Sequence, residues 1–326
     1  MEIKIVPCKE EYIADCVRIS VTAYEYIHDK YADHLGRALH DAVMADWRPA
    51  KARSIEEQQR GEHAIVALAD GEVAGFASWY DGKYCGQVGN NAVDPKYRGN
   101  GIAGLLYHHV LDDMRRHGYR YAFVQTGLDD GHAPARRAYG KVGFTKGLPY
   151  MTYYQVLNPV EHCAPCKWDD GVELVPYDAK YRNDCRSLAV TAWEGIHDSY
   201  IEQIGRNLHD GAIPNWRADT QDAVEQLLSS GRGYVLLADG KVAGFIGYRA
   251  AGEIGQISNN AVDPAYRGRG FAGRMHAYVL DRMRDEGMKY ARVQTGLDDG
   301  HAAARRAYQK AGFEKYLPSI TFYQAL

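Results

Sequence analysis

The sequence has little of several features that mark particular classes of protein. Its longest uninterrupted apolar runs, such as Ala64–Ala69, are far shorter than the roughly 18 residues that a membrane-spanning helix needs. Its 39 basic and 42 acidic residues leave a net charge of −3, which argues against a broad electrostatic grip on nucleic acid. The six cysteines are too few for a disulfide framework and suit a reducing compartment. Because the start of the chain also lacks an apolar signal core, we expect a cytoplasmic protein that binds neither nucleic acid nor membrane.

What the chain does have is an internal repeat. Its hydrophobic content of 46% is ordinary for a globular protein, and its length of 326 residues suggests two domains. A shift of 169 residues aligns the two halves without a gap, so that His28 matches His197 and Leu157 matches Leu326. We therefore expect a first domain over residues 1–157, a linker over 158–169 and a second domain over 170–326. The two halves could pack on each other as a pseudo-dimer, with the whole chain monomeric.

The pattern of apolar residues predicts alternating strands and helices in each half, and thus an α/β fold. In the first half, strands are expected at residues 3–7, 64–69, 71–79, 87–93, 121–125 and 150–156, and helices at 10–24, 34–45, 102–114 and 132–142. Asp70-Gly71 is a strong signal for a hairpin turn between the second and third strands.

The linker carries two cysteines in a Cys-x-x-Cys spacing. Its two prolines favour an extended segment over a helix. His162, Cys163 and Cys166 lie close together in the sequence, but a structural zinc site needs four ligands and no second pair follows. We interpret the segment as a tether with two thiols, and we expect no metal site in the protein.

A glycine-containing turn stands between a predicted strand and a predicted helix in each half. It spans residues 91–103, and residues 260–272 repeat it in closely similar form. The first N–H groups of a helix have no partner within the helix, and together with the helix dipole they favour a pyrophosphate. Gly99 and Gly101 let the backbone approach such a group without a Cβ in the way, and Arg98 adds a cation. The turn is not a Walker loop, because it contains no Gly-Lys-Ser/Thr sequence.

The residues of this turn resemble the acetyl-CoA signature of the GCN5-related N-acetyltransferases. Arg98, Gly101 and Ala103 form an Arg-x-x-Gly-x-Ala pattern shortly after Val93-Asp94-Pro95. The second signature of that family, Asn-x-x-Ala-x-x-x-Tyr-x-x-x-Gly-Phe, is matched further along the chain. The matching residues are His132, Ala135, Tyr139 and Gly143-Phe144 in the first half, and His301, Ala304, Tyr308 and Gly312-Phe313 in the second. In both halves a histidine stands where the family usually has asparagine.

The resemblance covers both repeats and implies their fold and their co-substrate. Two tandem domains are implied, each a mixed, mostly antiparallel central sheet flanked by helices, with a pyrophosphate-binding strand-turn-helix. Acetyl-CoA would be held largely by backbone groups of the turn and of the strand before it. The implied binding residues are Ala92, Val93, Arg98, Gly99, Asn100, Gly101, Ile102, Ala103 and His132 in the first domain, and Ala261, Val262, Arg267, Gly268, Arg269, Gly270, Phe271, Ala272 and His301 in the second.

The resemblance also assigns a catalytic acid, Tyr139 in the first domain and Tyr308 in the second. A thiolate with a pKa of about 8.5 leaves more easily if a neighbouring group protonates it. Each tyrosine would give its proton to the departing CoA sulfur. We expect direct attack by the amine, because no cysteine stands in a nucleophile setting, and Cys16 and Cys185 fall in helical patterns typical of core residues.

The amine must lose a proton before it attacks, and the sequence offers candidates for the base. Many family members use a glutamate on the strand before the turn, but residues 86–91 and 255–260 contain no carboxylate. A base from elsewhere or a water relay is therefore implied. His28 and His197 are the candidate bases, because histidine titrates near neutrality, and the alternative is that they only line the acceptor pocket. Asp129-Asp130 and Asp298-Asp299 could attract a cationic acceptor or cap the following helix.

Other polar residues in the segment that would cover the acceptor have simpler explanations. Asp29 could cap the following helix, and His40-Asp41 could lie on a solvated face. Trp47-Arg48 is interpreted as packing plus a surface charge.

We expect an acetyl-CoA-dependent N-acetyltransferase that acetylates a primary amine, more readily on a small molecule than on a protein. Both turns, both tyrosines and both His-Asp pairs are present, which favours two CoA-competent sites with unequal acceptor pockets. Three alternatives stay open: one catalytic and one structural half, a different donor such as succinyl- or propionyl-CoA, and a CoA-binding sensor without turnover.

Overall fold

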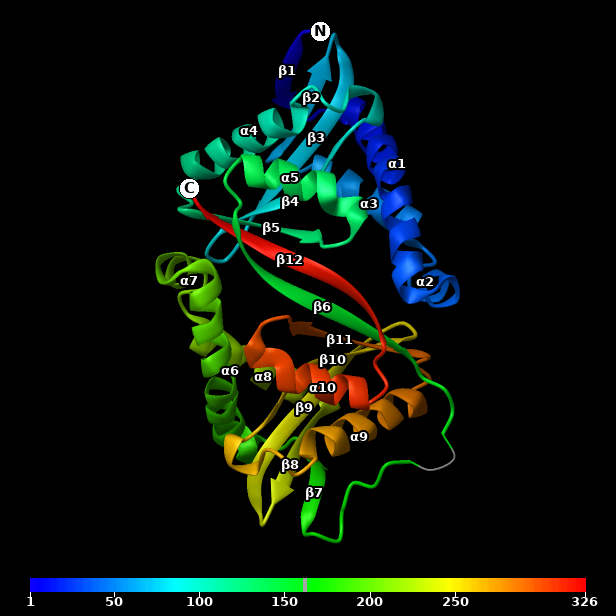
Figure 1. Ribbon diagram of the computed structural model, residues 1–326, viewed down its shortest axis with the longest axis vertical. Helices are drawn as coiled ribbons and strands as arrows, with labels where there is room; N and C mark the ends of the chain where they lie inside the picture. Colours follow the sequence, from blue (N-terminus) through cyan, green and yellow to red (C-terminus); the bar gives the residue numbers. More distant parts are fainter. Residues whose placement is uncertain (161–162) are drawn as a thin grey trace. The chain divides into compact units, whose positions relative to one another are not determined.

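The computed structural model describes residues 1–160 and 163–326, so His162 of the linker lies outside the described residues. The chain forms two compact units, named here unit 1 and unit 2 (Figure 1). Unit 1 contains Met1–Pro149, Gln203–Pro214 and Leu317–Leu326, and unit 2 contains Tyr150–Glu202 and Asn215–Tyr316. Among the described residues, no helix combines the length and apolar character needed to cross a membrane.

Unit 1 is built on a sheet whose strands lie in the order β1-β2-β3-β4-β5-β12. The strands are β1 (Ile3–Pro7), β2 (Ala64–Ala69), β3 (Glu72–Asp81), β4 (Gly86–Val93), β5 (Tyr121–Gly127) and β12 (Lys315–Ala325). Neighbours are antiparallel except β4 and β5, which are parallel. The hairpin turn predicted between β2 and β3 is confirmed, with φ of 49° at Asp70 and 91° at Gly71.

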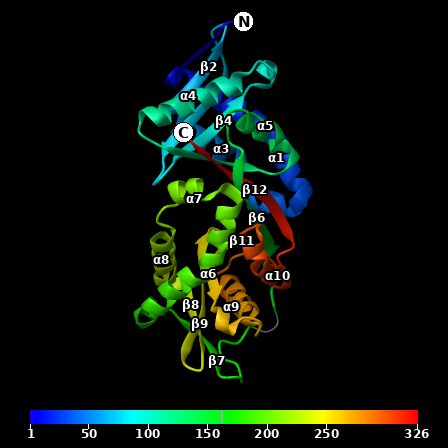
Figure 2. The same cartoon turned by 60° about the vertical axis from the view of Figure 1, so that its left-hand side comes forward.

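Helices cover both faces of this sheet, and the alternation of side chains along β2 shows why. The helices are α1 (Glu10–Leu35), α2 (Arg37–Val43), α3 (Trp47–Gln59), α4 (Ile102–Arg116), α5 (Ala133–Lys141) and α7 (Arg206–Ala212). Ile65 and Ala67 belong to the core that α4 and α5 cover, whereas Val66 between them packs with Ile19 of α1 and Ile55 of α3. The two helical layers can be followed in Figures 1 and 2.

Unit 2 repeats this arrangement in the strand order β6-β11-β10-β9-β8-β7. Its strands are β6 (Lys146–Val156), β7 (Val172–Pro176), β8 (Gly233–Ala238), β9 (Lys241–Ala251), β10 (Ile254–Val262) and β11 (Tyr290–Gly296). Its helices are α6 (Arg182–Ile204), α8 (Trp216–Leu227), α9 (Phe271–Asp285) and α10 (Ala302–Lys310). Leu236 of β8 joins the core under α9 and α10, and its neighbour Val235 joins the core under α6 and α8.

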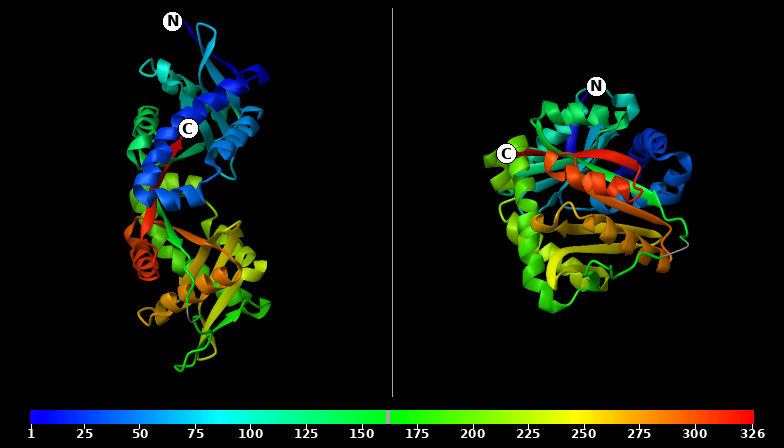
Figure 3. Two further views of the ribbon diagram at one scale, coloured as in Figure 1. Left: turned by 90° about the vertical axis from the view of Figure 1, so that its right-hand side faces the viewer. Right: turned by 60° about the horizontal axis from the view of Figure 1, so that its bottom comes forward.

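Each unit takes its last strand from the other sequence repeat. β12 ends the second repeat, and its residues Ser319 to Ala325 pair with β5 in unit 1. β6 ends the first repeat, and its residues Tyr150 to Val156 pair with β11 in unit 2. The paths of β6 and β12 can be followed in Figure 3. The boundaries of the compact units therefore differ from the repeat boundaries at residues 157 and 170, and α7 of the second repeat also groups with unit 1.

The helices before β2 differ from the sequence prediction. α1 runs unbroken from Glu10 to Leu35, so the predicted break between residues 24 and 34 is wrong. The chain turns at Gly36, with a φ of 82°, before α2 begins. α3 has no apolar repeat that would predict it, because its buried residues are Ile55 and Gln59.

The described part of the linker contains no helix, as its prolines predict. The carbonyl of Cys166 accepts a hydrogen bond of 2.7 Å from the N–H of Leu174, and Lys167 pairs with Glu173 in an antiparallel bridge. Cys163 and Cys166 are both free thiols and both exposed. These contacts place the second part of the linker along β7.

Candidate active site

The central feature of unit 1 is a strand that separates from its neighbour. β4 pairs with β5 at Gly86 and Gln87, while β4 itself continues to Val93. On its other side, the ladder with β3 shifts register between Ala77 and Trp79, so that β4 contains one residue more than β3 over this stretch. Such a bulge re-aims the side chains beside it. The end of β4, with the predicted residues Ala92 and Val93, thus extends beyond its pairing with β5, and an extended ligand could pair there.

β4 leads into the turn predicted to bind pyrophosphate. Gly99 and Gly101 have φ of 85° and 75°, a conformation that favours glycine. The N–H of Leu105 donates to the carbonyl of Gly101 at 3.2 Å and begins the helical hydrogen bonding of α4. The N–H groups of residues 102–104 therefore have no partner inside the helix. Arg98, beside them, is exposed, and the Asn100 side chain donates to the carbonyl of residue 97 at 3.0 Å.

Unit 2 repeats both the bulge and the turn. The ladder between β9 and β10 shifts register between Ile257 and Asn260. Gly268 and Gly270 have φ of 81° and 78°, and the N–H of Arg274 donates to the carbonyl of Gly270 at 3.2 Å. The residues predicted to hold the pyrophosphate thus adopt the same backbone conformation in both units.

An aspartate at the start of each turn fixes its backbone. Asp94 accepts hydrogen bonds from the N–H of Lys96 at 3.0 Å and from the guanidinium of Arg18 at 2.9 Å. Burial opposes ionisation of Asp94, but these donors outweigh burial and lower its pKa. Asp263 repeats the backbone contact, accepting from the N–H of Ala265 at 2.8 Å.

The predicted catalytic acid of unit 1, Tyr139, is held against the bulged strand by an asparagine. The Tyr139 hydroxyl lies 2.9 Å from Asn91 Nδ2, which can donate to it, and 3.2 Å from Asn91 Oδ1. The hydroxyl of Tyr107 donates to Asn91 Oδ1 at 2.7 Å. Burial raises the pKa of Tyr139 to about 12, although the hydrogen bonds with Asn91 and Tyr107 lower it. The phenol therefore keeps its proton at neutral pH.

Tyr308 occupies the same place in unit 2 with one different neighbour. Asn260 Nδ2 donates to the Tyr308 hydroxyl at 2.8 Å, and burial raises the pKa of Tyr308 to about 12. His276 replaces the second tyrosine, with its ring centroid 4.9 Å from that of Tyr308 and its Nε2 3.4 Å from Asn260 Oδ1. Burial lowers the pKa of His276 to about 4, so this histidine is neutral at pH 7.

The histidines that replace the asparagine of the family pattern are tied to neighbouring aspartates. His132 Nδ1 lies 2.7 Å from Asp129 Oδ2, and the His132 N–H donates to Asp129 Oδ1 at 3.2 Å. Burial opposes ionisation of Asp129, but its hydrogen bonds with His132 lower its pKa overall. A Cβ at Gly127 would lie 2.4 Å from the His132 ring, so glycine is required there. Asp298 and His301 form the same pair at 2.6 Å, and the capping alternative for both aspartates is confirmed.

The candidate base of unit 1, His28, ends a chain of hydrogen-bonded side chains. His28 Nδ1 lies 3.0 Å from His40 Nε2, and His40 Nδ1 lies 2.8 Å from Asp41 Oδ1. Because a carboxylate only accepts, His40 donates through Nδ1 to Asp41, and His28 donates through Nδ1 to His40. His28 Nε2 then carries a lone pair. The His28 ring stacks on Trp47 at 3.9 Å, and burial together with nearby positive charges lowers its pKa to about 4. The expectation that His28 titrates near neutrality is therefore wrong, and its ring is neutral at pH 7.

Of the simpler explanations offered for this segment, one is wrong, one is right in part and one is confirmed. Asp29 lies inside α1 and pairs with Arg37 at 3.5 Å, so it caps no helix. His40 is buried at 3% exposure, whereas the Asp41 side chain beside it is 59% exposed, so the solvated face is wrong for His40 and right for Asp41. Arg48 forms a surface ion pair with Glu25 at 3.4 Å, in agreement with its interpretation as a surface charge.

The candidate base of unit 2 has the same stacking partner. His197 is buried and stacks on Trp216 at 3.9 Å. His209, the counterpart of His40, is buried and lies 2.8 Å from Asp210 through Nδ1. This His-Asp pair falls in Gln203–Pro214, the segment that groups with unit 1.

Polar side chains from α3 surround the bulge of β4. Lys51 Nζ lies 2.5 Å from Asn90 Oδ1 and 3.4 Å from the centroid of the Tyr24 ring. Gln58 Oε1 accepts from Asn90 Nδ2 at 2.6 Å and from the hydroxyl of Ser78 at 3.3 Å. None of these interactions could be read from the sequence, because α3 itself is not predicted.

The corresponding positions in unit 2 lack the lysine, the glutamine and the serine. The repeat places Thr220, Leu227 and Gly247 at the positions of Lys51, Gln58 and Ser78. A Cβ at Gly247 would lie 2.7 Å from Leu227 Cγ, so the leucine approaches the backbone of β9 closely. The two units therefore differ in polarity at the bulge, although the strand itself is bulged in both.

The structure brings together the turn, the end of β4 and Tyr139, and it adds residues that the sequence analysis missed. Asn91 and Asn260 connect the bulged strands to the two tyrosines, and Tyr107 and His276 are their buried neighbours. Asn91 and Asn260 are the first residues of the two repeated turn segments, 91–103 and 260–272, and this repetition is the signal that could have identified them.

Comparisons with known proteins agree with this arrangement. The family model described as the Acetyltransferase (GNAT) family matches residues 24–144 and again residues 193–313. A GCN5-related N-acetyltransferase from Sphaerobacter thermophilus has a TM-score of 0.60 and 15% identity, covering 99% of this chain and 95% of that protein. A tandem GNAT protein from the clavulanic acid biosynthesis pathway has a TM-score of 0.54 and 17% identity, covering 99% and 98%.

A third solved structure extends the comparison to a region of a larger protein. It is the GCN5-related glucosamine N-acetyltransferase region of a fungal multi-domain GH3 beta-N-acetylglucosaminidase, with a TM-score of 0.57 and 14% identity over 99% of this chain and 38% of that chain. At such identities these structures show the fold alone, and a search of curated proteins finds no similar sequence. The two family matches show that the chain belongs to the GNAT acetyltransferase family and contains two tandem GNAT domains.

Proposed function

We propose that this protein is an acetyl-CoA-dependent N-acetyltransferase that acetylates a primary amine on a small molecule by direct attack on the thioester. One observation carries the proposal. In both units a buried tyrosine hydroxyl is hydrogen-bonded to an asparagine on a bulged strand, directly before a turn whose amides can hold a pyrophosphate.

The donor would lie along this strand and turn. The N–H groups that begin α4 and α9 face outward at a helix N-terminus, where the dipole also favours the negative charge of a pyrophosphate. The end of β4 extends beyond its pairing with β5, and the pantetheine arm could pair with Ala92 and Val93 as an added strand. Ala261 and Val262 end the corresponding strand of unit 2.

The chemistry requires a proton to leave the amine and another to reach the sulfur. The amine nitrogen forms the new C–N bond as the C–S bond breaks, and the thiolate leaves with the bonding electron pair. Tyr139 or Tyr308, protonated at neutral pH, can donate to that sulfur. His28 is neutral at pH 7 and its Nε2 carries a lone pair, so it is the proposed acceptor in unit 1 of the proton that the amine nitrogen loses as the C–N bond forms. His197, which stacks on Trp216 as His28 stacks on Trp47, takes that role in unit 2.

Direct transfer is favoured over an acyl-cysteine intermediate by the state of the buried thiols. Cys16 and Cys185 lie in the core at 0% and 1% exposure, as their helical patterns predict. Burial raises the pKa of Cys85 to about 11 and that of Cys185 to about 12. Such thiols are protonated at neutral pH and are poor nucleophiles.

The test is the release of free thiol from acetyl-CoA across a panel of small amines, with a control that lacks acceptor. We expect release that depends on the amine, together with an acetylated product detected by mass spectrometry. The double variant Tyr139→Phe/Tyr308→Phe is expected to keep its CoA affinity and lose turnover. CoA binding without thiol release for any amine or acyl donor would contradict the proposal and favour a sensor.

A further inference from the structure

A second cluster of titratable side chains lies on unit 1, at the opposite end of α4 from the pyrophosphate turn. Asp113 and His117 stand four residues apart near the end of α4, and His63 directly precedes β2. At 1.5 Å per residue, the length of α4 separates this cluster from the turn by about 20 Å. The cluster is thus remote from the groups proposed to hold the donor.

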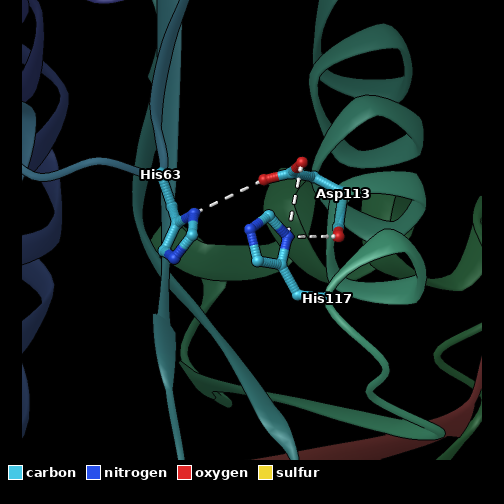
Figure 4. A group of neighbouring side chains, drawn as sticks. All are labelled: His63, Asp113 and His117. Carbon is cyan, nitrogen blue, oxygen red and sulfur yellow. Dashed lines mark hydrogen bonds and ion pairs between the residues drawn. The ribbon is translucent and has the colours of Figure 1, made fainter.

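The three side chains converge on one point. One possible ligand atom from each of His63, Asp113 and His117 lies within 4.8 Å of the others (Figure 4). His63 Nδ1 is 3.5 Å from Asp113 Oδ2. Ligands at about 2.0–2.2 Å from a tetrahedral zinc ion lie roughly 3.3–3.5 Å from one another, so small side-chain rotations would complete this geometry.

Contacts around the cluster orient the three groups as ligands, through hydrogen bonds for Asp113 and His117 and through ring stacking for His63. His117 Nδ1 donates to the backbone carbonyl of Asp113 at 2.9 Å, which leaves Nε2 of that ring with a lone pair. His63 stacks on Trp79 at 3.8 Å, and its Nε2 lies 3.8 Å from Asp81, on the side away from Asp113. The indole N–H of Trp79 donates to Asp113 Oδ2 at 2.9 Å. Contacts of this kind fix the orientation of ligands around metal ions.

Other contacts of the carboxylate leave room for a metal. Arg116 donates to Asp113 Oδ1 at 3.0 Å, and Oδ2 faces His63. A carboxylate oxygen has two lone pairs, so Oδ2 can accept from Trp79 and bind a metal as well. The His117 side chain is 43% exposed, which gives an ion and its water ligands access from solvent.

The same corner of unit 2 carries its own fixed cation. The repeat places Arg232, Arg282 and Glu286 where unit 1 has His63, Asp113 and His117. Arg232 donates to Glu286 at 2.8 Å, and its guanidinium carbon lies 6.0 Å from the centroid of the Tyr248 ring. Unit 2 thus has a permanent positive charge at this corner, the Arg232 guanidinium. Unit 1 has two imidazoles there instead, and an external cation can bind between them.

We propose that His63, Asp113 and His117 form a binding site for a borderline divalent metal ion of the zinc type. Two imidazole nitrogens and one carboxylate oxygen are a ligand set that zinc accepts, with water in the fourth position. The ion ties the end of α4 to the start of β2. Three residues separated by 49 and 3 intervening positions form no recognisable spacing, so the sequence does not reveal this site, and we expected a metal site nowhere in the protein.

The test is metal binding by the full chain carrying Cys163→Ser and Cys166→Ser, which removes the two exposed thiols of the linker. Zn²⁺ is titrated by calorimetry, and Co²⁺ by its visible absorption. We expect one equivalent of either ion to bind, and the melting temperature to rise with Zn²⁺.

Two substitutions in the cluster, each made in that chain, decide the assignment. His117→Ala removes a half-exposed ligand, and His63→Arg introduces the arginine that unit 2 has at the same position. Each substitution should weaken Zn²⁺ binding at least tenfold and abolish the visible absorption of bound Co²⁺. His108→Ala, an exposed histidine of the same helix, is the control and should bind normally. Circular dichroism verifies folding. The proposal is overturned if no metal binds without the linker thiols, or if His117→Ala and His63→Arg both bind as tightly as the parent.

Discussion

The two units are alike where the donor would bind and different where an acceptor would approach. Both have the bulged strand, the glycine turn with positive φ and a buried tyrosine bonded to asparagine. At the bulge, unit 1 has Lys51, Gln58 and Ser78, and unit 2 has apolar or smaller residues. Residues that persist in both repeats mark a shared reaction, and residues that diverge mark what each unit meets alone. We therefore expect both units to use the same donor on different amines.

The largest effect should come from separating the repeats. Each unit takes its last strand from the other repeat, so a chain truncated to residues 1–157 loses β12, the partner of β5. We expect such a protein to dimerise or aggregate, because its own β6 occupies the equivalent place in the repeat and can pair with β5 of a second copy. Light scattering after size exclusion measures this, and a folded monomer with a cooperative melt would contradict the exchange of strands.

The next largest effect should come from the two tyrosines, taken one at a time. Loss of a general acid costs typically 10²–10⁴-fold in rate, so Tyr139→Phe and Tyr308→Phe should each disable one unit while CoA still binds. If the acceptor sides differ, the two variants should lose different amines from the panel, with polar amines depending on Tyr139. If both variants lost the same fraction of turnover with every amine, the two units would have the same acceptor preference, contrary to this prediction.

Acid should reveal the difference between Tyr107 and His276. Burial holds the pKa of His276 at about 4, below the 6.5 of a free histidine, so the unfolded chain binds more protons between these values. Protonation of His276 therefore does not lower the free energy of unfolding above pH 6.5. As the pH falls from 6.5 towards 4, it lowers the free energy of unfolding by up to about 3 kcal/mol.

The matched variants exchange the two residues. His276→Tyr should reduce the loss of melting temperature between pH 7 and pH 4.5, and Tyr107→His should increase it. His28, whose pKa is also about 4, keeps part of the acid sensitivity in both variants. Equal acid sensitivity in His276→Tyr and the parent would show that His276 is not held neutral by burial.

The smallest effect should come from making the bulge of unit 1 resemble that of unit 2. Gln58→Leu removes a hydrogen-bond acceptor for Asn90 and Ser78. We expect the free energy of unfolding to fall by about 1–2 kcal/mol, because these polar groups lose a partner. We expect KM for a polar amine to rise about tenfold with KM for acetyl-CoA unchanged. Leu227→Gln is the reciprocal control in unit 2. An unchanged KM for the amine in Gln58→Leu would show that the polar side chains at the bulge do not contribute to acceptor binding.

The local motifs of the donor site could be predicted from the sequence, because their physics is local. A strand, two glycines and a helix start lie within thirteen consecutive residues, 91–103, and their spacing alone predicts the turn that the structure contains. The hairpin at Asp70-Gly71 is a similar case, since the turn depends on the conformations of those two residues.

The acceptor side could not be predicted, because it depends on contacts between distant elements. α3 contributes Lys51 and Gln58, yet its few buried positions leave no periodic signal. The burial of His40 and the exchange of β6 and β12 depend on tertiary packing, which a repeat in the sequence does not reveal. The internal repeat even favours the simpler arrangement, with each half complete in itself.

The most direct test of two equivalent donor sites is the stoichiometry of CoA binding to the full chain. Calorimetric titration with CoA should give two equivalents per chain. The charge-reversing variants Arg98→Glu and Arg267→Glu should each weaken one of the two sites, because each adds a negative charge at a pyrophosphate turn. A single equivalent, lost completely in only one of these variants, would mean that one unit has kept the fold of a donor site without its function.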